Sequence, residues 1–256
     1  MVLGAVAGDV IGSIYEGRPH KTTGIPLVNS RARFTDDTVL TIATAAAILD
    51  GRSYGEAYKE FGRAYPHAGY GGSFKEWLRS SSPAPYNSFG NGSAMRVSPV
   101  GWAFEAEQEV LDQAAASASC THNHPEGVKG AQAVALAVWM ARRGEAKDSI
   151  RREITGRFGY DLDRSVEEIR PGYHFDVTCQ GSVPEALRCF LEADGTESAI
   201  RLAISLGGDA DTQACIAGAV ADAFFGPVSR EVGEHVRSRV PDHLLRRHDE
   251  FRQRYL

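Results

Sequence analysis

Two segments of the sequence place carboxylates and hydroxyls together immediately before a long apolar stretch. Residues 207–212 read Gly-Gly-Asp-Ala-Asp-Thr, and apolar side chains then recur every three or four positions as far as Phe225. Residues 35–38 read Thr-Asp-Asp-Thr, and the same spacing follows as far as Leu49. This periodicity is typical of a helix with one buried face. Each acidic cluster is therefore predicted to lie at the start of a helix that packs inside the protein.

The number of polar side chains in each cluster exceeds what a helix start needs. One carboxylate or hydroxyl is enough to cap the first turn, and capping is the simpler explanation for either cluster alone. If the two clusters face each other, four aspartates and two threonines converge without a lysine or arginine among them. Two divalent cations would balance this charge, and oxygen ligands favour Mg²⁺ or Mn²⁺ over Zn²⁺. The candidate metal ligands are Thr35, Asp36, Asp37, Asp209, Asp211 and Thr212.

The composition is typical of one globular domain. The 256 residues are 43% hydrophobic and 24% charged, which is enough apolar content for a large core. The net charge of −5 argues against a general nucleic-acid binder, because such proteins usually display a basic surface. The arginines near the C-terminus form either a local basic binding patch or the solvated face of a helix. We expect one domain over residues 1–256, and a monomer.

The cysteines and the apolar segments indicate the cellular compartment in which the protein is expected to occur. Four cysteines occur without a CxxC pair, which is typical of free thiols in a reducing environment. The first residues lack the basic region of a signal peptide, and no apolar run approaches the ~18 residues that a membrane span needs. We therefore expect a cytoplasmic protein that does not associate with membranes.

Three glycines, Gly4, Gly8 and Gly12, lie four positions apart in an otherwise apolar segment. As a helix, this segment has a flat side against which another backbone can pack closely. Each glycine costs ~1 kcal/mol relative to alanine in a helix, so close packing has to offset that cost. Asp9 and Glu16 bracket the segment, and each alone is interpreted as a cap or a solvated charge rather than a ligand.

The remaining chain follows helical rather than strand periodicity. Residues 128–142 are apolar on nearly all sides, which indicates a helix at the centre of the protein. A further helix is predicted to begin at Ser182, with Pro184 in its first turn. No segment shows the alternation of apolar and polar residues that is typical of a half-buried strand. The predicted fold class is all-α.

The segment 88–93, Ser-Phe-Gly-Asn-Gly-Ser, is a second candidate for ligand contact. Its glycines let a backbone approach a phosphate or a sugar closely, although a simple turn is the favoured explanation of these residues alone. His122 and His124 lie on a segment that precedes a proline. Two histidines could bind zinc, but no third ligand of matching type is near. His122 is therefore interpreted either as a ligand contact or as a structural residue.

Six motifs in the same order resemble those of the ADP-ribosylglycohydrolase family, which includes dinitrogenase-reductase-activating glycohydrolases and ADP-ribosyl-acceptor hydrolases for arginine and serine linkages. The resemblance covers nearly the whole chain. The motifs are residues 8–12 (Gly-Asp-Val-Ile-Gly) with Glu16, residues 35–38, residues 90–96 (Gly-Asn-Gly-Ser-Ala-Met-Arg), residues 121–122 (Thr-His), residues 182–184 (Ser-Val-Pro) and residues 207–212.

This resemblance implies an orthogonal bundle of many helices with two Mg²⁺ or Mn²⁺ ions at its centre, held by the six candidate ligands. It also implies two sets of working residues. The catalytic residues would be Glu16, Asp37 and Asp211. The ADP-ribose contacts would be Ser88, Phe89, Gly90, Asn91, Gly92, Ser93 and His122. As we align them, the dinitrogenase-reductase relatives have an acidic residue where this chain has Ser88, so a mechanism that needs that acid does not transfer.

The implied activity is metal-dependent hydrolysis of the ribose C1″ bond, which releases ADP-ribose from a protein, a nucleic acid or a small molecule. The alternative is a non-catalytic ADP-ribose-binding or structural protein that reuses the fold. The presence of all six inferred ligands favours the enzyme. Residues 12–16, Gly-Ser-Ile-Tyr-Glu, resemble the serine-linked hydrolases, which favours O-linked substrates, with arginine-linked substrates as the second choice.

Overall fold

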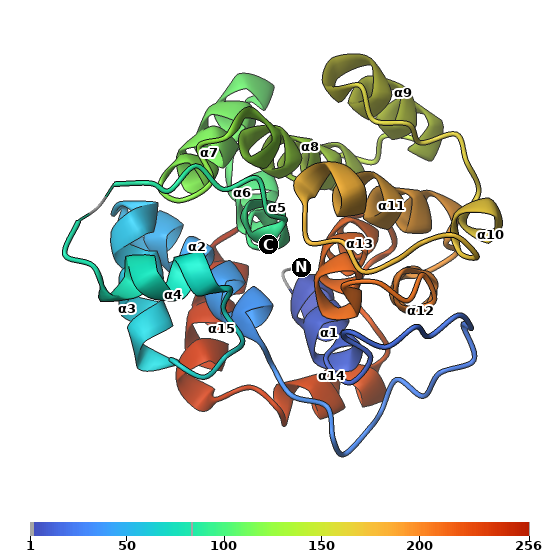
Figure 1. The fold of residues 1–256 in the computed structure, drawn as a ribbon, viewed down its shortest axis with the longest axis horizontal. Helices are drawn as coiled ribbons and strands as arrows, with labels where there is room; N and C mark the ends of the chain where they lie inside the picture. Colours follow the sequence, from blue (N-terminus) through green and yellow to red (C-terminus); the bar gives the residue numbers. More distant parts are fainter. Residues whose placement is uncertain (1–2, 83, 256) are drawn as a thin grey trace.

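The computed structural model describes residues 3–82 and 84–255 (Figure 1). Within them the chain forms fifteen α-helices and no β-strand, apart from an isolated bridge between Gly90 and Thr178. The helices are α1 (Leu3–Gly12), α2 (Asp36–Asp50), α3 (Tyr54–Ala64), α4 (Gly72–Arg79), α5 (Gly92–Met95), α6 (Ser98–Ala103), α7 (Glu107–Ser119), α8 (Pro125–Arg142), α9 (Lys147–Phe158), α10 (Val166–Ile169), α11 (Cys179–Glu192), α12 (Thr196–Ile204), α13 (Ala210–Phe225), α14 (Arg230–Arg237) and α15 (Asp242–Tyr255). The all-α prediction is confirmed.

Helix α13 lies inside the bundle, with α1, α8, α11 and α12 packed around it (Figure 1). Residues 210–222 of this helix are all buried, including the polar side chains in its first turn. Most of its buried side chains are small, so the surrounding helices approach its backbone closely. In the part of the chain that the structure describes, no helix combines the length and the apolar character that crossing a membrane requires.

The glycine segment forms α1, and its flat side packs directly on the backbone of α13. A Cβ atom added to Gly8 would overlap the Ala214 carbonyl, and one added to Gly12 would lie 2.5 Å from the Cα of Asp211. No side chain fits between the two helices at these positions. The predicted close packing is confirmed, and it brings Asp9 on α1 beside the acidic start of α13.

Replacing Gly8 by alanine is expected to lower the free energy of unfolding by at least about 2 kcal/mol, because the added methyl group forces the two backbones apart. Gly156→Ala is the matched control, since Gly156 lies in α9 with nothing within 4 Å of an added Cβ. This control is expected to stabilise by about 0.5 to 1 kcal/mol through helix propensity. Urea unfolding measures both variants, and equal stability would contradict the packing.

Both acidic clusters lie at helix starts, as predicted. Helix α2 begins at Asp36, and the hydroxyl of Thr35 caps it by accepting a hydrogen bond from the Asp37 N–H at 3.2 Å. Helix α13 begins at Ala210, and the Asp209 side chain makes no capping hydrogen bond. Capping therefore employs one of the clustered side chains, which leaves the aspartates for another role. Helix α8 is buried along most of its length, in agreement with its predicted central position.

The predicted start of α11 was wrong. The helix begins at Cys179, and Thr178 caps it by accepting a hydrogen bond from the Gly181 N–H at 3.1 Å. Pro184 therefore lies inside the helix rather than in its first turn. The Ser182 hydroxyl donates to the Thr178 carbonyl at 2.6 Å instead of capping. Because Thr178 is also fixed by its bridge to Gly90, the cap forms one turn earlier than the proline suggests.

Candidate metal and substrate site

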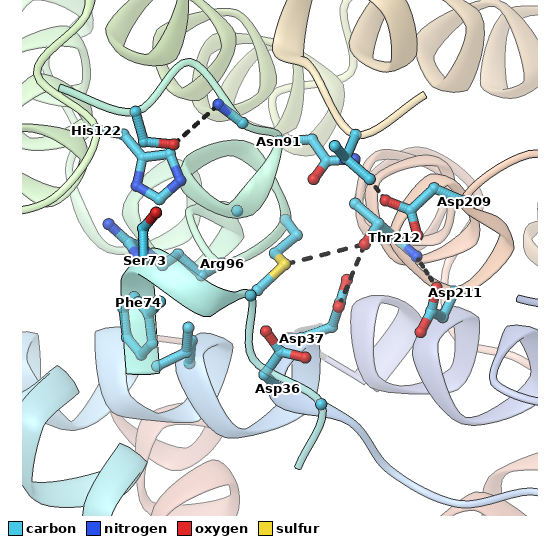
Figure 2. Close-up of a pocket in the computed structure, with 18 of the residues that line it drawn as sticks. Asp36, Asp37, Ser73, Phe74, Asn91, Arg96, His122, Asp209, Asp211 and Thr212 are labelled. Atoms are coloured by element: carbon cyan, nitrogen blue, oxygen red, sulfur yellow. Dashed lines mark hydrogen bonds between the residues drawn. The ribbon is translucent and has the colours of Figure 1, made fainter. Parts of the chain in front are cut away.

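The two acidic helix starts lie next to each other in the wall of a pocket (Figure 2). Asp37 on α2 accepts a hydrogen bond from the Thr212 hydroxyl on α13 at 3.3 Å, although 175 positions separate the two residues. Asp211 and Asp209 lie beside Thr212, and all three line the pocket together with Asp36 and Asp37. The convergence that the sequence left conditional is therefore present in the structure.

Asp9 fits the first of its two interpretations, a cap, although the helix start that it caps is that of α2 and not of its own helix. It is not a solvated charge, because its side chain is completely buried. Its carboxylate accepts hydrogen bonds from the Thr35 N–H at 2.9 Å, the Thr35 hydroxyl at 2.7 Å and the Thr38 N–H at 3.0 Å. The Thr38 hydroxyl also donates to it. Asp9 thus fastens α1 to the start of α2 and fixes the position of the Thr35–Asp37 cap.

The carboxylates fall into two groups that share Asp211. One oxygen each from Asp9, Asp37 and Asp211 lie within 4.8 Å of one another, and so do oxygens from Glu16, Asp209 and Asp211. The first group is buried, whereas Glu16 is exposed at the edge of the second. Asp36 lines the pocket but belongs to neither group. This arrangement offers two adjacent oxygen-lined positions rather than one.

Burial and mutual repulsion disturb the acid–base properties of these aspartates. Burial raises the pKa of Asp37 and Asp211 well above the usual range, and the charges of neighbouring aspartates raise it further. Burial and the charge of Asp9 raise the pKa of Asp36 to about 8. One buried oxygen of Asp37, Oδ1, has no hydrogen-bond partner in the described part of the chain. A buried carboxylate needs a counter-charge or a proton, so divalent cations fit this donor set.

The pocket has a volume of about 410 Å³, which is within the usual range of small-molecule sites. Of the predicted substrate contacts, Ser88, Gly90, Asn91, Gly92 and His122 line it. Phe89 and Ser93 do not. Phe89 points outward, and its ring centroid lies 5.4 Å from that of His124. The buried Ser93 hydroxyl donates to the Gly127 carbonyl at 2.7 Å.

Asn91 connects the glycine loop to the acidic cluster. Its Nδ2 donates to the Asp209 carboxylate at 2.7 Å and to the Ser182 hydroxyl at 3.2 Å. These bonds fix the orientation of Asp209, which has no capping bond to hold it. Three ordered motifs therefore meet at one point, where the Asn91 amide donates to a carboxylate in the pocket wall.

The two histidines have different roles. His124 caps α8 by accepting a hydrogen bond from the Glu126 N–H at 3.1 Å, and it does not line the pocket. His122 is buried in the pocket wall, where burial and the positive charge of Arg96 hold its pKa well below the usual value. It is therefore neutral at physiological pH. No histidine joins either acidic group of the described residues, so the geometry gives no support to a zinc site.

Several pocket residues carried no signal that the sequence analysis used. Phe175 and Val177 are about half exposed and line the pocket from a segment in which no function was readable. Ser73 and Phe74, in the first turn of α4, line another part of the wall (Figure 2). Gly69, Gly71 and Gly72 could have indicated a second close approach to a ligand, because glycine-rich loops often line such sites.

Comparisons with known proteins agree with the geometry. The profile of the ADP-ribosylglycohydrolase family matches residues 1–253. The chain is 28% identical to ADP-ribosylhydrolase ARH3 of Mus musculus, over 87% of this chain and 82% of that protein. It is 27% identical to the Homo sapiens ARH3, over 87% of this chain and 84% of that protein. A solved structure titled "ADP-ribosylglycohydrolase-related protein complex" superposes with a TM-score of 0.71, at 24% identity, over 98% and 92% of the two chains. The chain belongs to the ADP-ribosylglycohydrolase family.

Proposed function

We propose that this protein is a divalent-cation-dependent hydrolase that cleaves the ribose C1″ bond of an ADP-ribosylated substrate and releases ADP-ribose. The observation that carries the proposal is the pair of carboxylate groups sharing Asp211 at one side of a pocket. The membership of the family and the similarity to ADP-ribosylhydrolase ARH3 support the reaction class.

The six residues proposed as ligands from the sequence remain the proposed metal ligands. Asp37 and Asp211 lie in the buried group and Asp209 in the outer group, while Asp36 offers a carboxylate on the pocket wall. The hydroxyls of Thr35 and Thr212 each lie 3.3 Å from a carboxylate oxygen of Asp37, which supports including them in the proposed ligand set. Two Mg²⁺ or Mn²⁺ ions bound here would supply a Lewis acid for the ribose hydroxyls and a more acidic water.

The chain's own residues would hold the rest of the substrate. The backbone of residues 90–92 can approach a phosphate or sugar because Gly90 and Gly92 have no side chains to block it. His122, on the same wall, offers a neutral imidazole. The exposed ring of Phe175 provides a surface on which a nucleobase can stack. These contacts would orient ADP-ribose so that its terminal ribose reaches Asp37 and Asp211.

The acceptor that leaves determines whether the chain must supply a proton. A guanidine is basic enough to leave protonated, whereas a serine alkoxide needs a general acid. Glu16 is exposed at the pocket edge, and one of its oxygens lies within 4.8 Å of oxygens of Asp209 and Asp211. We therefore propose Glu16 as the residue that moves this proton, with O-linked substrates favoured over arginine-linked ones.

The experiment offers matched serine- and arginine-linked ADP-ribosylated peptides to the wild type and to Glu16→Gln. We expect the wild type to release ADP-ribose from the serine peptide and the variant to do so about 10²-fold more slowly, because the variant cannot donate the proton. Glu76→Gln is the matched control on the exposed side of α4 and should behave as the wild type. Fast arginine release that persists in Glu16→Gln, without serine release, would contradict the preference. Binding of ADP-ribose without turnover of either peptide would favour the non-catalytic alternative.

A further inference from the structure

Helices α3 and α4 lie side by side, and a second pocket between them is lined by positive charges (Figure 1). This pocket has a volume of about 650 Å³, and none of its lining residues is acidic. Such a concentration of one sign of charge attracts anions, and it stands out in a chain whose net charge is −5. The lining residues are Arg63, Lys75, Arg79, His67, Gly62, Gly69, Pro66 and Leu78.

The three cations of this pocket have no acidic partner in the part of the chain that the structure describes. There, the side chains of Lys75 and Arg79 are exposed and form no hydrogen bond or ion pair. The Arg63 guanidinium donates through Nε to the Leu78 carbonyl at 2.8 Å and through Nη2 to the Ser80 carbonyl at 3.4 Å. These two bonds fix the end of α4 and leave the charge of Arg63 without a counter-charge.

The arginines near the C-terminus differ in this respect. Arg230, Arg237 and Arg252 line a further pocket, but Glu234 and Asp249 line it with them. Arg230 lies 2.7 Å from Glu234, and Arg237 lies 2.7 Å from Asp249. The positive charge of that pocket is therefore largely balanced by the chain itself, whereas that of the pocket between α3 and α4 is not.

The segment that connects α3 to α4 separates the basic pocket from the candidate active site. Gly69 lines both pockets. Before it, Pro66 and His67 line the basic pocket, and after it residues 71–72 line the active-site pocket. A Cβ added to Gly69 would lie 3.0 Å from Oδ1 of Asp36, so this segment also borders the acidic cluster. A substrate held at the acidic cluster therefore has the basic pocket directly beside it, across a few residues of backbone.

We propose that the basic pocket between α3 and α4 binds acidic side chains of the peptide that carries the ADP-ribose, an inference that rests on the proposed function. Guanidinium and ammonium groups pair with carboxylates, and the arginine fork matches the shape of a carboxylate. The peptide is held here while its modified residue lies in the adjacent pocket. Because this contact is remote from the scissile bond, it lowers KM and leaves kcat unchanged.

A peptide suits this pocket better than a nucleic acid does. Phosphates repeat along a strand, so proteins that bind single strands present a basic groove that follows the backbone. Here the cations are confined to one pocket, and the adjacent pocket is lined by carboxylates that include Glu16 and Asp36. A strand that crosses both pockets would meet these carboxylates, whereas a peptide can carry its acidic side chains at one position only.

The kinetic test uses two ADP-ribosylated peptides that have the linkage cleaved by the wild type and differ only in the flanking residues, which are glutamates in one and glutamines in the other. The wild type should use the glutamate peptide with about tenfold higher kcat/KM, through a lower KM, because several exposed charge pairs add up. Lys75→Gln/Arg79→Gln should lose this preference. Both side chains are exposed and have no partner to lose, so the fold is expected to survive.

The matched control is Arg152→Gln/Arg230→Gln, which removes the same charge outside both pockets. These two side chains are 67% and 91% exposed. The control should keep the preference within about twofold, which separates a local site from the effect of net charge. Equal kcat/KM for the two peptides in the wild type, or an equal loss of preference in the control, would overturn the proposal.

Binding of the unmodified glutamate peptide gives a readout that does not depend on turnover. Amide NMR shifts should change within residues 62–79 of the wild type and stay unchanged in Lys75→Gln/Arg79→Gln, and high salt should weaken the binding. Shifts confined to other residues would overturn the site. Displacement of the peptide by a lower concentration of single-stranded RNA of equal charge would overturn the choice of a peptide. If no ADP-ribosylated peptide is hydrolysed, the proposed function fails, and these shifts still decide whether the pocket binds acidic peptides.

Discussion

Replacing Asp211 by asparagine is expected to lower the turnover of an ADP-ribosylated substrate by more than about 10²-fold while the fold survives. Asp211 is the carboxylate that the two acidic groups share, so its charge acts at both proposed cation positions. Asparagine has the same shape and can still accept the hydrogen bond from the Thr212 N–H, which is 3.0 Å from Asp211 Oδ1. The released ADP-ribose can be quantified by chromatography, with the fold followed by circular dichroism.

The stability of the same variant separates a metal site from a helix cap. In the presence of a chelator, Asp211→Asn should be at least as stable as the wild type, because one of several mutually repelling buried charges is removed. Asp222→Asn is the matched control, a buried aspartate on the same helix outside the pocket, and it should keep its turnover. An Asp211→Asn variant that unfolds, or one that keeps a tenth or more of the activity, would contradict the assigned role.

Stripping divalent cations with EDTA is expected to abolish turnover, and Mg²⁺ or Mn²⁺ should restore it. The buried aspartates present only oxygen atoms, which suit hard divalent cations, and burial with the charges of neighbouring aspartates raises the pKa of Asp37 and Asp211. Cations that bind the folded state should also stabilise it by about 2.7 kcal/mol at a concentration 100 times the Kd. Thermal unfolding with and without Mg²⁺ measures this effect. Undiminished turnover in EDTA would contradict the metal-dependent mechanism.

Much of the fold could be predicted because helical periodicity is local. The apolar spacing after residues 38 and 212 identified α2 and α13, and the excess of carboxylates over capping needs indicated that the clusters have another role. The glycine spacing in α1 indicated a close helix contact, although not which helix lies on the other side. Each of these patterns spans only a short stretch of sequence. The structure contains both helices and the close contact of α1 that the patterns predicted.

The missed features depend on contacts between distant segments. Asp9 can be interpreted as a cap or as a solvated charge until α1 packs on α13 and directs its carboxylate at Thr35 and Thr38. Arg96 is a pocket residue only because α5 and α7 lie close together. Pro184 suggested a helix start, and the pairing of Thr178 with Gly90 overrode that local preference. Residue spacing alone contains no information about such contacts between distant segments.

The central claim is that the two acidic helix starts together bind two divalent cations through a shared aspartate. The most direct measurement is the number of Mn²⁺ or Mg²⁺ ions bound per chain, determined by equilibrium dialysis and elemental analysis for the wild type and for Asp211→Asn. The account predicts two ions for the wild type and a loss of binding at both positions in the variant, since Asp211 belongs to both acidic groups. A wild type that binds no cation, or a variant that binds two ions as tightly as the wild type, would contradict it.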